Sequence, residues 1–358
     1  SKNPYESQPP RAFWRRAVSD VGADGINEIY APRFAIGQSD AIAAAGSCFA
    51  QHIGKQFKDR GFNFLDLEPP PNLLPKDHWH KFGFDLYSAR YGNVYSIRQL
   101  LQLFQRAFGD FKPAEPVWQT DGRFYDPFRP NIEPGGFETE QEVLKARDYH
   151  LFRAHQLLRR TELFVFTFGL TEAWVCTQDG AVLPTCPGTL AGTFDREKYR
   201  FHNFSFREVL QDAEAFIQFA LQRNSNMRFL FTVSPVPLTA TATDHHVLAA
   251  SVYSKSVLRA VVGELFANYS QVDYFPSYEL IASHPAKGMF FAPNMRSVTA
   301  EGVAYAMNSF FTAHDATGES AMHSEPATAP GGKKAAMDRP NVDDDIVCEE
   351  EILEALGK

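Results

Sequence analysis

A serine in a strand-to-helix turn is the position in this sequence best suited to nucleophilic chemistry. Ser47 follows the small, apolar residues 41–45 and Gly46, and it precedes residues 48–60, whose apolar side chains recur at helical spacing. A hydroxyl at that position lies beside the unpaired N–H groups and the positive dipole end of a helix, which can stabilise an oxyanion. Because serine is also a favoured N-cap, the pattern predicts either a nucleophile or a plain helix cap.

Cysteine chemistry is the alternative at the same turn. Cys48, next to Ser47, is a candidate nucleophile because a helix N-terminus favours the thiolate, but its position rather predicts a small core residue between sheet and helix. Cys176, Cys186 and Cys348 are too far apart for a zinc ribbon or a disulfide framework. Cys176 and Cys186 can meet across a hairpin, where we expect them to be reduced.

The histidines do not predict a metal site. His78 and His80 are two residues apart, and side chains at that spacing converge only on a strand. No histidine stands at a ligand spacing from a cysteine. No Gly-rich phosphate loop is present either, so that a nucleotide-binding module is the weakest interpretation of the chain. We therefore expect neither a metal nor another cofactor.

The order of apolar and amphipathic segments predicts a doubly wound parallel α/β sheet. The expected strands are residues 41–45, 62–67, 163–168, 227–233 and 272–276, and the expected helices are residues 48–60, 95–108, 138–161, 206–223, 247–269 and 299–311. Continuous apolar strands are typical of a sheet with both faces covered. The pair Asp179-Gly180 predicts an inserted hairpin at residues 173–186. Residues 112–137, rich in Pro and Gly, are expected to form a surface segment.

Parallel sheets collect ligands at the carboxyl ends of their strands. In this chain those ends carry Ser47, residues 169–172, the loop 234–246 and the residues after Tyr274. Polar groups that are distant in sequence are therefore expected to lie at one edge of the sheet.

Composition divides the chain into three parts. Residues 1–38 bear Pro, Arg and scattered aromatic residues and are expected to form an arm packed on the core, and residues 39–312 form the main domain. Residues 313–358 contain eleven acids and four bases and are expected to be a disordered acidic tail, with a short helix at residues 348–356. The tail is either a solubilising segment or a docking motif for a protein partner at residues 343–356.

Charge and hydropathy exclude two classes of partner. The net charge is −8, of which the tail carries seven, so that the remainder has no basic excess to hold nucleic acid. No run of about 18 apolar residues predicts a membrane span, and residues 1–4 lack an apolar signal core. With 44% hydrophobic residues and 32 Phe, the chain is expected to be a soluble cytoplasmic protein with an aromatic-rich interior.

The pentapeptide Gly46-Ser47-Cys48-Phe49-Ala50 is the signature from which the GSCFA family takes its name. The chain resembles that family from about residue 5 to residue 311, and the longer strings that look like the family are residues 90–95, 167–174, 233–238 and 274–279. The family is related to the SGNH or GDSL hydrolases. The resemblance therefore implies a flavodoxin-like sheet, a serine nucleophile directly after the first strand, and a bacterial protein.

The resemblance also implies an oxyanion hole around Ser47. In SGNH enzymes the nucleophile's own N–H, a glycine N–H and an asparagine side chain form this hole. Ser47 matches the nucleophile, and Gly92 with Asn93 matches a donor pair. Thr171 stands where the asparagine of a further block is usual, and its hydroxyl can still donate.

The usual catalytic base of SGNH enzymes is absent. Residues 294–297 read Asn-Met-Arg-Ser where those enzymes carry Asp-x-x-His, so that either the protein is inactive or the base comes from elsewhere. The string Asp244-His245-His246 looks like a recurring element of the branch of the family that has Pro-Val-Pro-Leu. We therefore expect His246, and next His245, to be the base, with Asp244 or Glu172 orienting the ring. The alternative is a surface loop with two solvated histidines.

The predicted reaction is acyl transfer through an acyl-serine. Water as acceptor gives an esterase, whereas a sugar hydroxyl gives an O-acyltransferase. Kinship with carbohydrate-directed SGNH enzymes implies acyl esters of glycans, above all acetyl esters, with Glu172, His245 and Tyr278 near the substrate. The alternative function is a catalytically inactive binding or scaffold protein whose acidic tail engages a partner.

Overall fold

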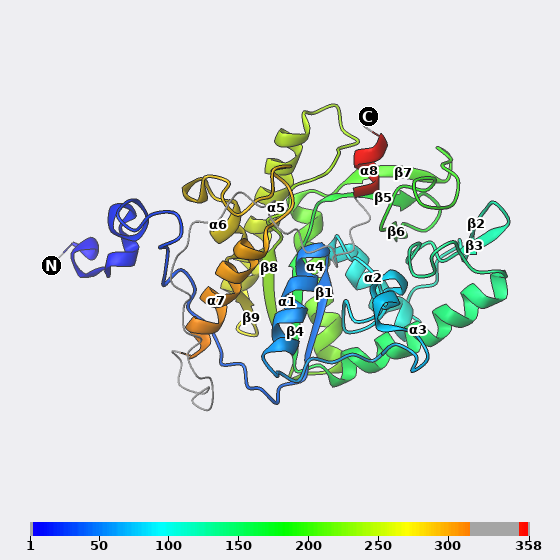
Figure 1. Cartoon of the computed structure of the whole chain (residues 1–358), viewed down its shortest axis with the longest axis horizontal. Coiled ribbons are helices and arrows are strands. Elements are labelled where there is room, and N and C mark those ends of the chain that lie inside the picture. Colours follow the sequence, from blue (N-terminus) through cyan, green and yellow to red (C-terminus); the bar gives the residue numbers. More distant parts are fainter. Residues whose placement is uncertain (1–2, 316–350, 357–358) are drawn as a thin grey trace. The chain divides into compact units, whose positions relative to one another are not determined.

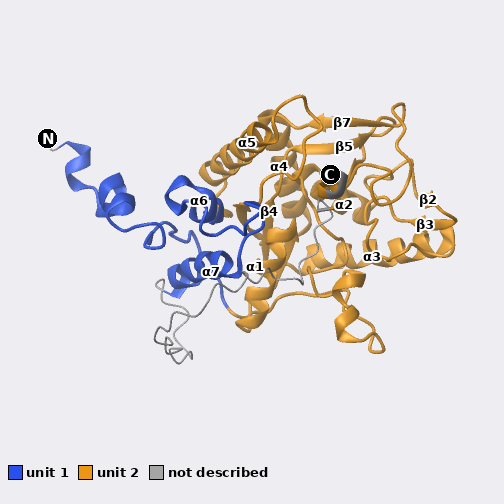
Figure 2. Cartoon of the chain, turned by 45° about the horizontal axis from the view of Figure 1, so that its top comes forward, with its two compact units in different colours: residues 1–37, 275–344 blue, residues 38–274, 345–358 orange. Residues whose placement is uncertain are grey.

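The computed structural model describes residues 3–315 and 351–356 of the chain (Figure 1). It divides into two compact units, residues 1–37 with 275–344 and residues 38–274 with 345–358 (Figure 2). Ser47 and the main sheet belong to the second unit.

The main sheet has four parallel strands in the order β1-β4-β8-β9. They are β1 (Ile42–Gly46), β4 (Leu163–Phe168), β8 (Arg228–Val233) and β9 (Val272–Tyr274). Every residue of β1 and β4 is buried, which is the pattern of a sheet covered on both faces. The predicted α/β class and parallel sheet are therefore confirmed.

The predicted strand at residues 62–67 is reduced to a single bridge. Phe64 pairs in parallel with Ile42, and Leu65 N donates to Ile42 O. Leu67 N instead donates to Ser88 O, so that the chain leaves β1 after two residues. With this bridge counted as the second strand, the order becomes 2-1-3-4-5, which is the flavodoxin-like order that the resemblance implied.

Five long helices surround this sheet in the second unit. They are α1 (Cys48–Asp59), α2 (Ile97–Phe108), α3 (Glu140–Arg160), α4 (Phe206–Arg223) and α5 (Val247–Asn268). Three of them begin with ordinary capping chemistry: the Ser96 side chain caps α2, and Thr139 and Ser205 form capping boxes at α3 and α4. All five lie close to their predicted positions.

Phenylalanine fills the space between the sheet and these helices. Phe104 of α2, Phe164 of β4 and Phe216 of α4 are fully buried and contact one another edge to face or tilted. Phe229 of β8 extends the cluster. The expected aromatic-rich interior is thus present.

Short antiparallel strands form two additional sheets. The hairpin of β5 (Glu172–Cys176) and β6 (Val182–Leu183) was predicted, and β7 (Tyr199–Asn203), which was not predicted, pairs with the other side of β5. A further hairpin joins β2 (Trp118–Thr120) to β3 (Arg123–Tyr125).

The predicted surface segment at residues 112–137 is partly wrong. Residues 126–130 are buried, and Asp126 and Arg129 are 1% and 5% exposed. The reason is an ion pair: Arg129 Nε donates to Asp126 Oδ2 at 2.9 Å, which makes the burial of two charged residues possible.

The first unit contains α6 (Ser277–Ala282) and α7 (Ala300–Asp315). In this unit the ring of Tyr30 packs against Phe275 and Phe310, and its hydroxyl lies 3.3 Å from His314 Nε2. The helix predicted to end at residue 311 continues to Asp315. Of the predicted tail, the helix α8 (Glu351–Leu356) is described, whereas residues 316–350 and 357–358 lie outside the described residues.

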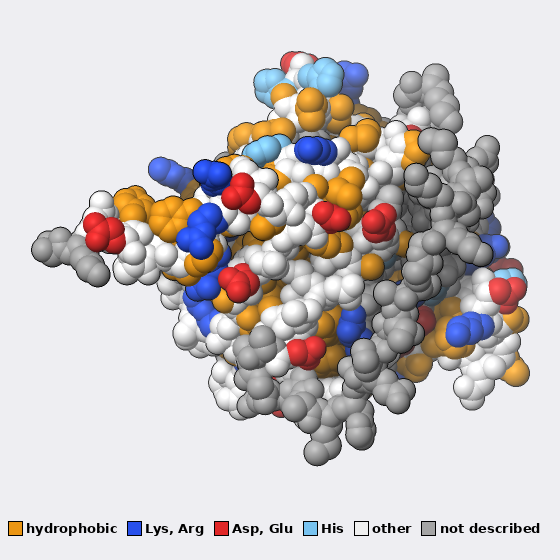
Figure 3. Space-filling model, turned by 60° about the vertical axis from the view of Figure 1, so that its left-hand side comes forward, with side chains coloured by type: hydrophobic (Ala, Val, Ile, Leu, Met, Phe, Trp, Pro, Cys, Tyr) orange, Lys and Arg blue, Asp and Glu red, His pale blue; other side chains and the backbone are white. Residues whose placement is uncertain are grey.

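Two features of the described residues concern a membrane and charged partners: the hydropathy of the helices and the distribution of surface charge. None of the helices described in residues 3–315 and 351–356 is both long and apolar enough to cross a membrane. On the face drawn in Figure 3, acidic and basic side chains are interspersed.

Candidate active site

Ser47 is the residue that joins β1 to α1. Gly46 ends the strand with a φ of +150°, and a β-carbon at Gly46 would stand 2.8 Å from Ala50 Cβ and 2.9 Å from Thr167 Cβ. Only glycine therefore allows this tight exit from the sheet. Ser47 is the N-cap residue of α1 by position, but its side chain makes no capping hydrogen bond. Its hydroxyl, on a residue that is 4% exposed, stands at the carboxyl edge of the sheet.

The loop of residues 87–95 lies directly against this turn. Val94 N donates to Gly46 O at 2.8 Å, and the Tyr87 hydroxyl lies 3.1 Å from Ser47 O. The same hydroxyl bonds to Asn93 Oδ1, which also accepts from Gln51 Nε2 at 3.2 Å. Because Oδ1 accepts these bonds, Nδ2 is the amide group with which Asn93 can donate. The Tyr87 hydroxyl thus links the predicted Asn93 to the backbone of Ser47.

Gly169, at the end of β4, borders Ser47 on another side. A β-carbon at Gly169 would stand 3.4 Å from Ser47 Oγ and 2.9 Å from Tyr95 O. The N–H groups of Gly169 and Leu170 both donate to Tyr95 O, at 3.1 and 3.2 Å. The backbone around Ser47 is therefore close-packed at this point and leaves no room for a side chain.

Lys255 of α5 is a buried cation at the same place, and sequence reasoning missed it. It is 3% exposed, and its Nζ donates to Gly169 O at 2.6 Å. On the same helix, Ser254 Oγ accepts from Thr171 N and Ser251 Oγ accepts from Leu238 N. Three polar residues within five positions of α5 were the signal that could have indicated this polar face.

Thr171 and Glu172 continue the chain beyond Gly169. Thr171 is fully buried, and its hydroxyl donates to Asn203 Oδ1 at 2.7 Å, so that its role as an oxyanion donor stays a prediction. Glu172 accepts from the Thr241 hydroxyl at 2.6 Å and from Ala242 N. Burial raises the pKa of Glu172 above its usual value, while these two hydrogen bonds oppose the shift.

The predicted base lies at the start of α5. His246 is the N-cap residue, and its Nδ1 accepts from Leu248 N at 3.1 Å. Asp244, His245 and His246 are all exposed. Among the described residues, no hydrogen bond joins either imidazole to the Ser47 hydroxyl.

Tyr278 and residues 294–297 belong to the first unit. Tyr278 is half-buried in α6, and burial raises the pKa of its hydroxyl. Asn294 Oδ1 accepts from Arg296 N and Ser297 N, while its Nδ2 donates to Ser297 Oγ at 2.9 Å. This closed turn is the segment that the resemblance compared with the Asp-x-x-His block of SGNH enzymes, and it contains neither Asp nor His.

Two cavities adjoin the residues around Ser47. The first, of about 290 Å³, is lined by Tyr95 and Leu170, by the aromatic rings of Trp174 and Phe201, and by Glu172. Leu353 of α8 and Thr241 also line it.

The second cavity, of about 180 Å³, also borders the 87–95 loop. It is lined by Gln51, Tyr87, Gly92 and Asn93, together with His80. The structure therefore places His80 beside the predicted oxyanion donors, although the sequence pattern had suggested it only as a rejected metal ligand. Within residues 3–315 and 351–356, no group of three His, Cys, Asp or Glu side chains is arranged to hold a metal ion.

Comparison with known proteins identifies the family to which this site belongs. No match was found among curated proteins or among solved structures. The profile of the GSCFA family matches residues 41–310, well over half of the chain, and this range includes β1, Ser47, the 87–95 loop, Gly169 and Lys255. The chain therefore belongs to the GSCFA family.

Proposed function

We propose that this protein is a serine-dependent acyl-ester hydrolase or O-acyltransferase of the SGNH type. The placement of Ser47 carries the proposal: the serine stands between a parallel strand and a helix N-terminus, and its hydroxyl does not cap that helix. A serine that served only as an N-cap would accept a hydrogen bond from the second or third helical N–H. The Ser47 hydroxyl accepts no such bond, which leaves it available for the reaction we propose.

The reaction proceeds through an acyl-serine intermediate. Ser47 Oγ bonds to the ester carbonyl carbon and passes its proton to a base, while the carbonyl electrons move to the oxygen. N–H groups at the start of α1 and the Asn93 amide, which Tyr87 and Gln51 hold in place, would stabilise that oxyanion. The alcohol leaves with the proton from the base, and water or a sugar hydroxyl then takes the acyl group from Ser47.

His246 remains our proposed base, with Asp244 or Glu172 orienting it. Because His246 Nδ1 accepts a bond from Leu248 N, the neutral ring carries its hydrogen on Nε2, and Nδ1 would have to leave that bond to take the serine proton. Two other residues, Lys255 and His80, are alternative candidates for the base. Lys255 Nζ contacts the carbonyl of Gly169, the residue that borders Ser47, and lysine fills the base role in Ser–Lys sites. His80 lines the cavity next to Asn93.

The larger cavity supports an acyl ester of a glycan as the substrate class. Trp174 is half-buried and lines it together with the ring of Phe201, so that an apolar sugar face can stack there. The Glu172 carboxylate and the Thr241 hydroxyl line the same cavity and can hydrogen-bond to sugar hydroxyls. Tyr95 and Leu170 line this cavity, and Tyr95 O accepts hydrogen bonds from the N–H groups of Gly169 and Leu170. Because Gly169 borders Ser47, an ester bound in this part of the cavity would be close to Ser47.

Labelling with a fluorophosphonate probe tests this proposal. We expect stoichiometric labelling of the wild type and none of Ser47→Ala, whereas Ser270→Ala, at an exposed serine, should label normally. His246→Ala, Lys255→Met and His80→Ala identify the base, because only its removal should lower the labelling rate by about 100-fold or more. Loss in Lys255→Met or His80→Ala alone would make His246 the wrong base while leaving the nucleophile in place.

A non-catalytic binding or scaffold role is the second candidate. The closed Asn294–Ser297 turn favours it, since no imidazole or carboxylate stands at that sequence position. An unlabelled wild type, under conditions in which a control serine esterase reacts, would establish this role instead. The cytoplasmic location and a protein partner for residues 343–356 stay predictions.

A further inference from the structure

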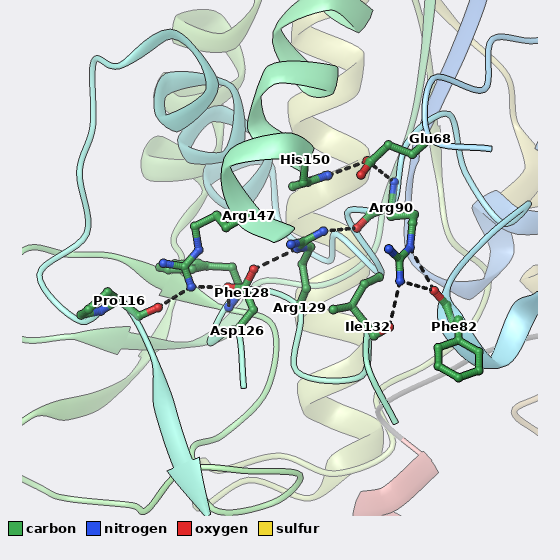
Figure 4. A network of polar contacts seen from close by, with 10 residues as sticks. All are labelled: Glu68, Phe82, Arg90, Pro116, Asp126, Phe128, Arg129, Ile132, Arg147 and His150. Atoms are coloured by element: carbon green, nitrogen blue, oxygen red, sulfur yellow. Dashed lines mark hydrogen bonds and ion pairs between the residues drawn. The ribbon is translucent and has the colours of Figure 1, made fainter. Parts of the chain in front are cut away.

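A buried network of charges joins residues from separate segments of the chain, among them Glu68, Asp126, Arg129, Arg147 and His150 (Figure 4). Asp126 accepts from Arg129 Nε and from Arg147 Nη2, each at 2.9 Å. Glu68 Oε2 accepts from Arg90 N at 2.7 Å and contacts His150 Nδ1 at 2.6 Å. The two carboxylates are thereby satisfied.

The guanidinium groups of this network outnumber its carboxylates. Arg106, Arg129 and Arg147 surround Asp126, and all three are at most 9% exposed. Burial raises the pKa of Asp126, but the charges of Arg147, Arg129 and Arg106 outweigh it and hold that pKa well below the usual range. Asp126 is thus a carboxylate that balances only one of three positive charges.

Arg106 is the member without an acceptor. Its guanidinium lies 3.8 Å from the ring centre of Phe128, and its Nε and Nη2 are buried with no hydrogen-bond partner among the described residues. Burial lowers the pKa of Arg106 to about 9; the charge of Asp126 opposes this shift, and the charges of Arg147 and Arg129 add to it. At neutral pH it is still a cation, so that it leaves an uncompensated charge in the interior.

The unpaired donors share one small cavity. Arg106, Arg129 and His150 line a space of about 20 Å³ with Tyr91 and Gln99. Arg129 Nη2 and His150 Nε2 also have no partner among the described residues. A space of this size holds about one water-sized sphere, so that its occupant is a single small species.

We propose that this cavity is a binding site for one monoatomic anion, with chloride as its ordinary occupant, held between Arg106 and Arg129. An anion satisfies the buried donors and offsets the excess positive charge, whereas a water molecule satisfies donors only. His150 Nε2, which has no hydrogen-bond partner among the described residues, also borders the cavity, while His150 Nδ1 contacts Glu68.

The site would also brace the loop next to Ser47. Gln99, which lines the cavity, donates to Asn93 O at 3.0 Å and accepts from Tyr95 N at 2.9 Å. Tyr91, on the other wall, hydrogen-bonds to Ala44 O in β1. An anion there is therefore expected to stabilise the fold around the loop.

Thermal unfolding of the full chain tests the proposal. Sodium gluconate is replaced stepwise by sodium chloride, or by bromide, at constant ionic strength. We expect a saturable rise in Tm of about 4 °C at 100 times the dissociation constant. Arg106→Met should abolish the rise, because it removes the uncompensated charge. Arg223→Met should retain it, because Arg223 stacks on Phe219 but already has Asp110 as its partner.

Diffraction from crystals grown in bromide gives a second readout that does not depend on a variant's folding. An anomalous peak between Arg106 and Arg129 is expected. A Tm that is equal in chloride and gluconate, a halide response that persists in folded Arg106→Met, or an ordered water in place of the bromide peak would each overturn the proposal.

Discussion

Alanine at position 169 tests whether the space beside Ser47 belongs to a working site. Gly169 does not have a positive φ, so that the substitution adds no backbone strain of its own. Its β-carbon would stand 2.9 Å from Tyr95 O and 3.4 Å from Ser47 Oγ. The first contact is shorter than real β-carbons tolerate, and its partner is backbone, so that the 87–95 loop must move. Overpacking of this kind costs about 1–3 kcal/mol of stability.

The assay is the rate of fluorophosphonate labelling, with Tm measured in parallel. Displacing catalytic groups by about 1 Å lowers rates by about 100-fold, and we expect a loss of that order in Gly169→Ala. Gly192→Ala is the matched control, because its β-carbon would stand 2.8 Å from the Trp118 ring and its φ is +76°. It should lower Tm at least as much, yet leave the labelling rate unchanged.

The comparison separates a damaged site from a damaged fold. If Gly169→Ala labels at the wild-type rate while its Tm falls as in Gly192→Ala, then Ser47 does not depend on this space and the reasoning from the Gly169 contacts is wrong. Equal loss of labelling in both variants would likewise refute it, because the loss would then follow stability alone.

Three further predictions concern stability. Tyr87→Phe removes the hydroxyl that joins Ser47 O and Asn93 Oδ1, and should cost about 1–3 kcal/mol in urea unfolding as well as slowing the labelling. Asp126→Asn leaves Arg129 and Arg147 without their carboxylate and should cost about 3–5 kcal/mol of the free energy of unfolding. The pKa of Asp126 is lowered in the folded state, so that the unfolded chain binds this proton first as the pH falls. The stability of the wild type should therefore decrease as the pH drops below about 4. Ser205→Ala breaks the capping box of α4 and should cost about 1 kcal/mol, and an unchanged urea midpoint would contradict it.

The elements that position Ser47 were predictable because their signals are local. The run at residues 41–45, the glycine at position 46 and the helical spacing after it fix a strand, a turn and a helix from neighbouring residues alone. The long strands and helices follow from the same periodicity. The short strand β7 was missed because the alternation of aromatic and polar residues in it covers only four positions, and the strand is held by pairing with β5.

The polar interior was not predictable in this way. Residues 126–130 looked like part of a surface loop, and their burial depends on Arg129 within the segment and on Arg147 of α3, which both pair with Asp126. Lys255 was likewise missed, since the Gly169 carbonyl to which it donates is a backbone group 86 residues away. Patterns of hydrophobicity cannot indicate pairs that only the folded chain brings together.

The cost of the polar contacts at Ser47 favours catalysis over a scaffold role. The 87–95 loop has no regular secondary structure until α2 begins at Ile97, so that it is held by Tyr87, Asn93 and Gln99 through buried hydrogen bonds. Such networks are expensive to bury, and a scaffold would be at least as stable with apolar side chains there. Holding an amide donor rigidly beside a serine is what oxyanion stabilisation requires, because preorganised dipoles need not reorient during the reaction. Replacing Gln51 and Asn93 by Leu together should therefore preserve the fold, as judged by circular dichroism, yet abolish labelling at Ser47; labelling at the wild-type rate would remove the case for an oxyanion hole at this loop.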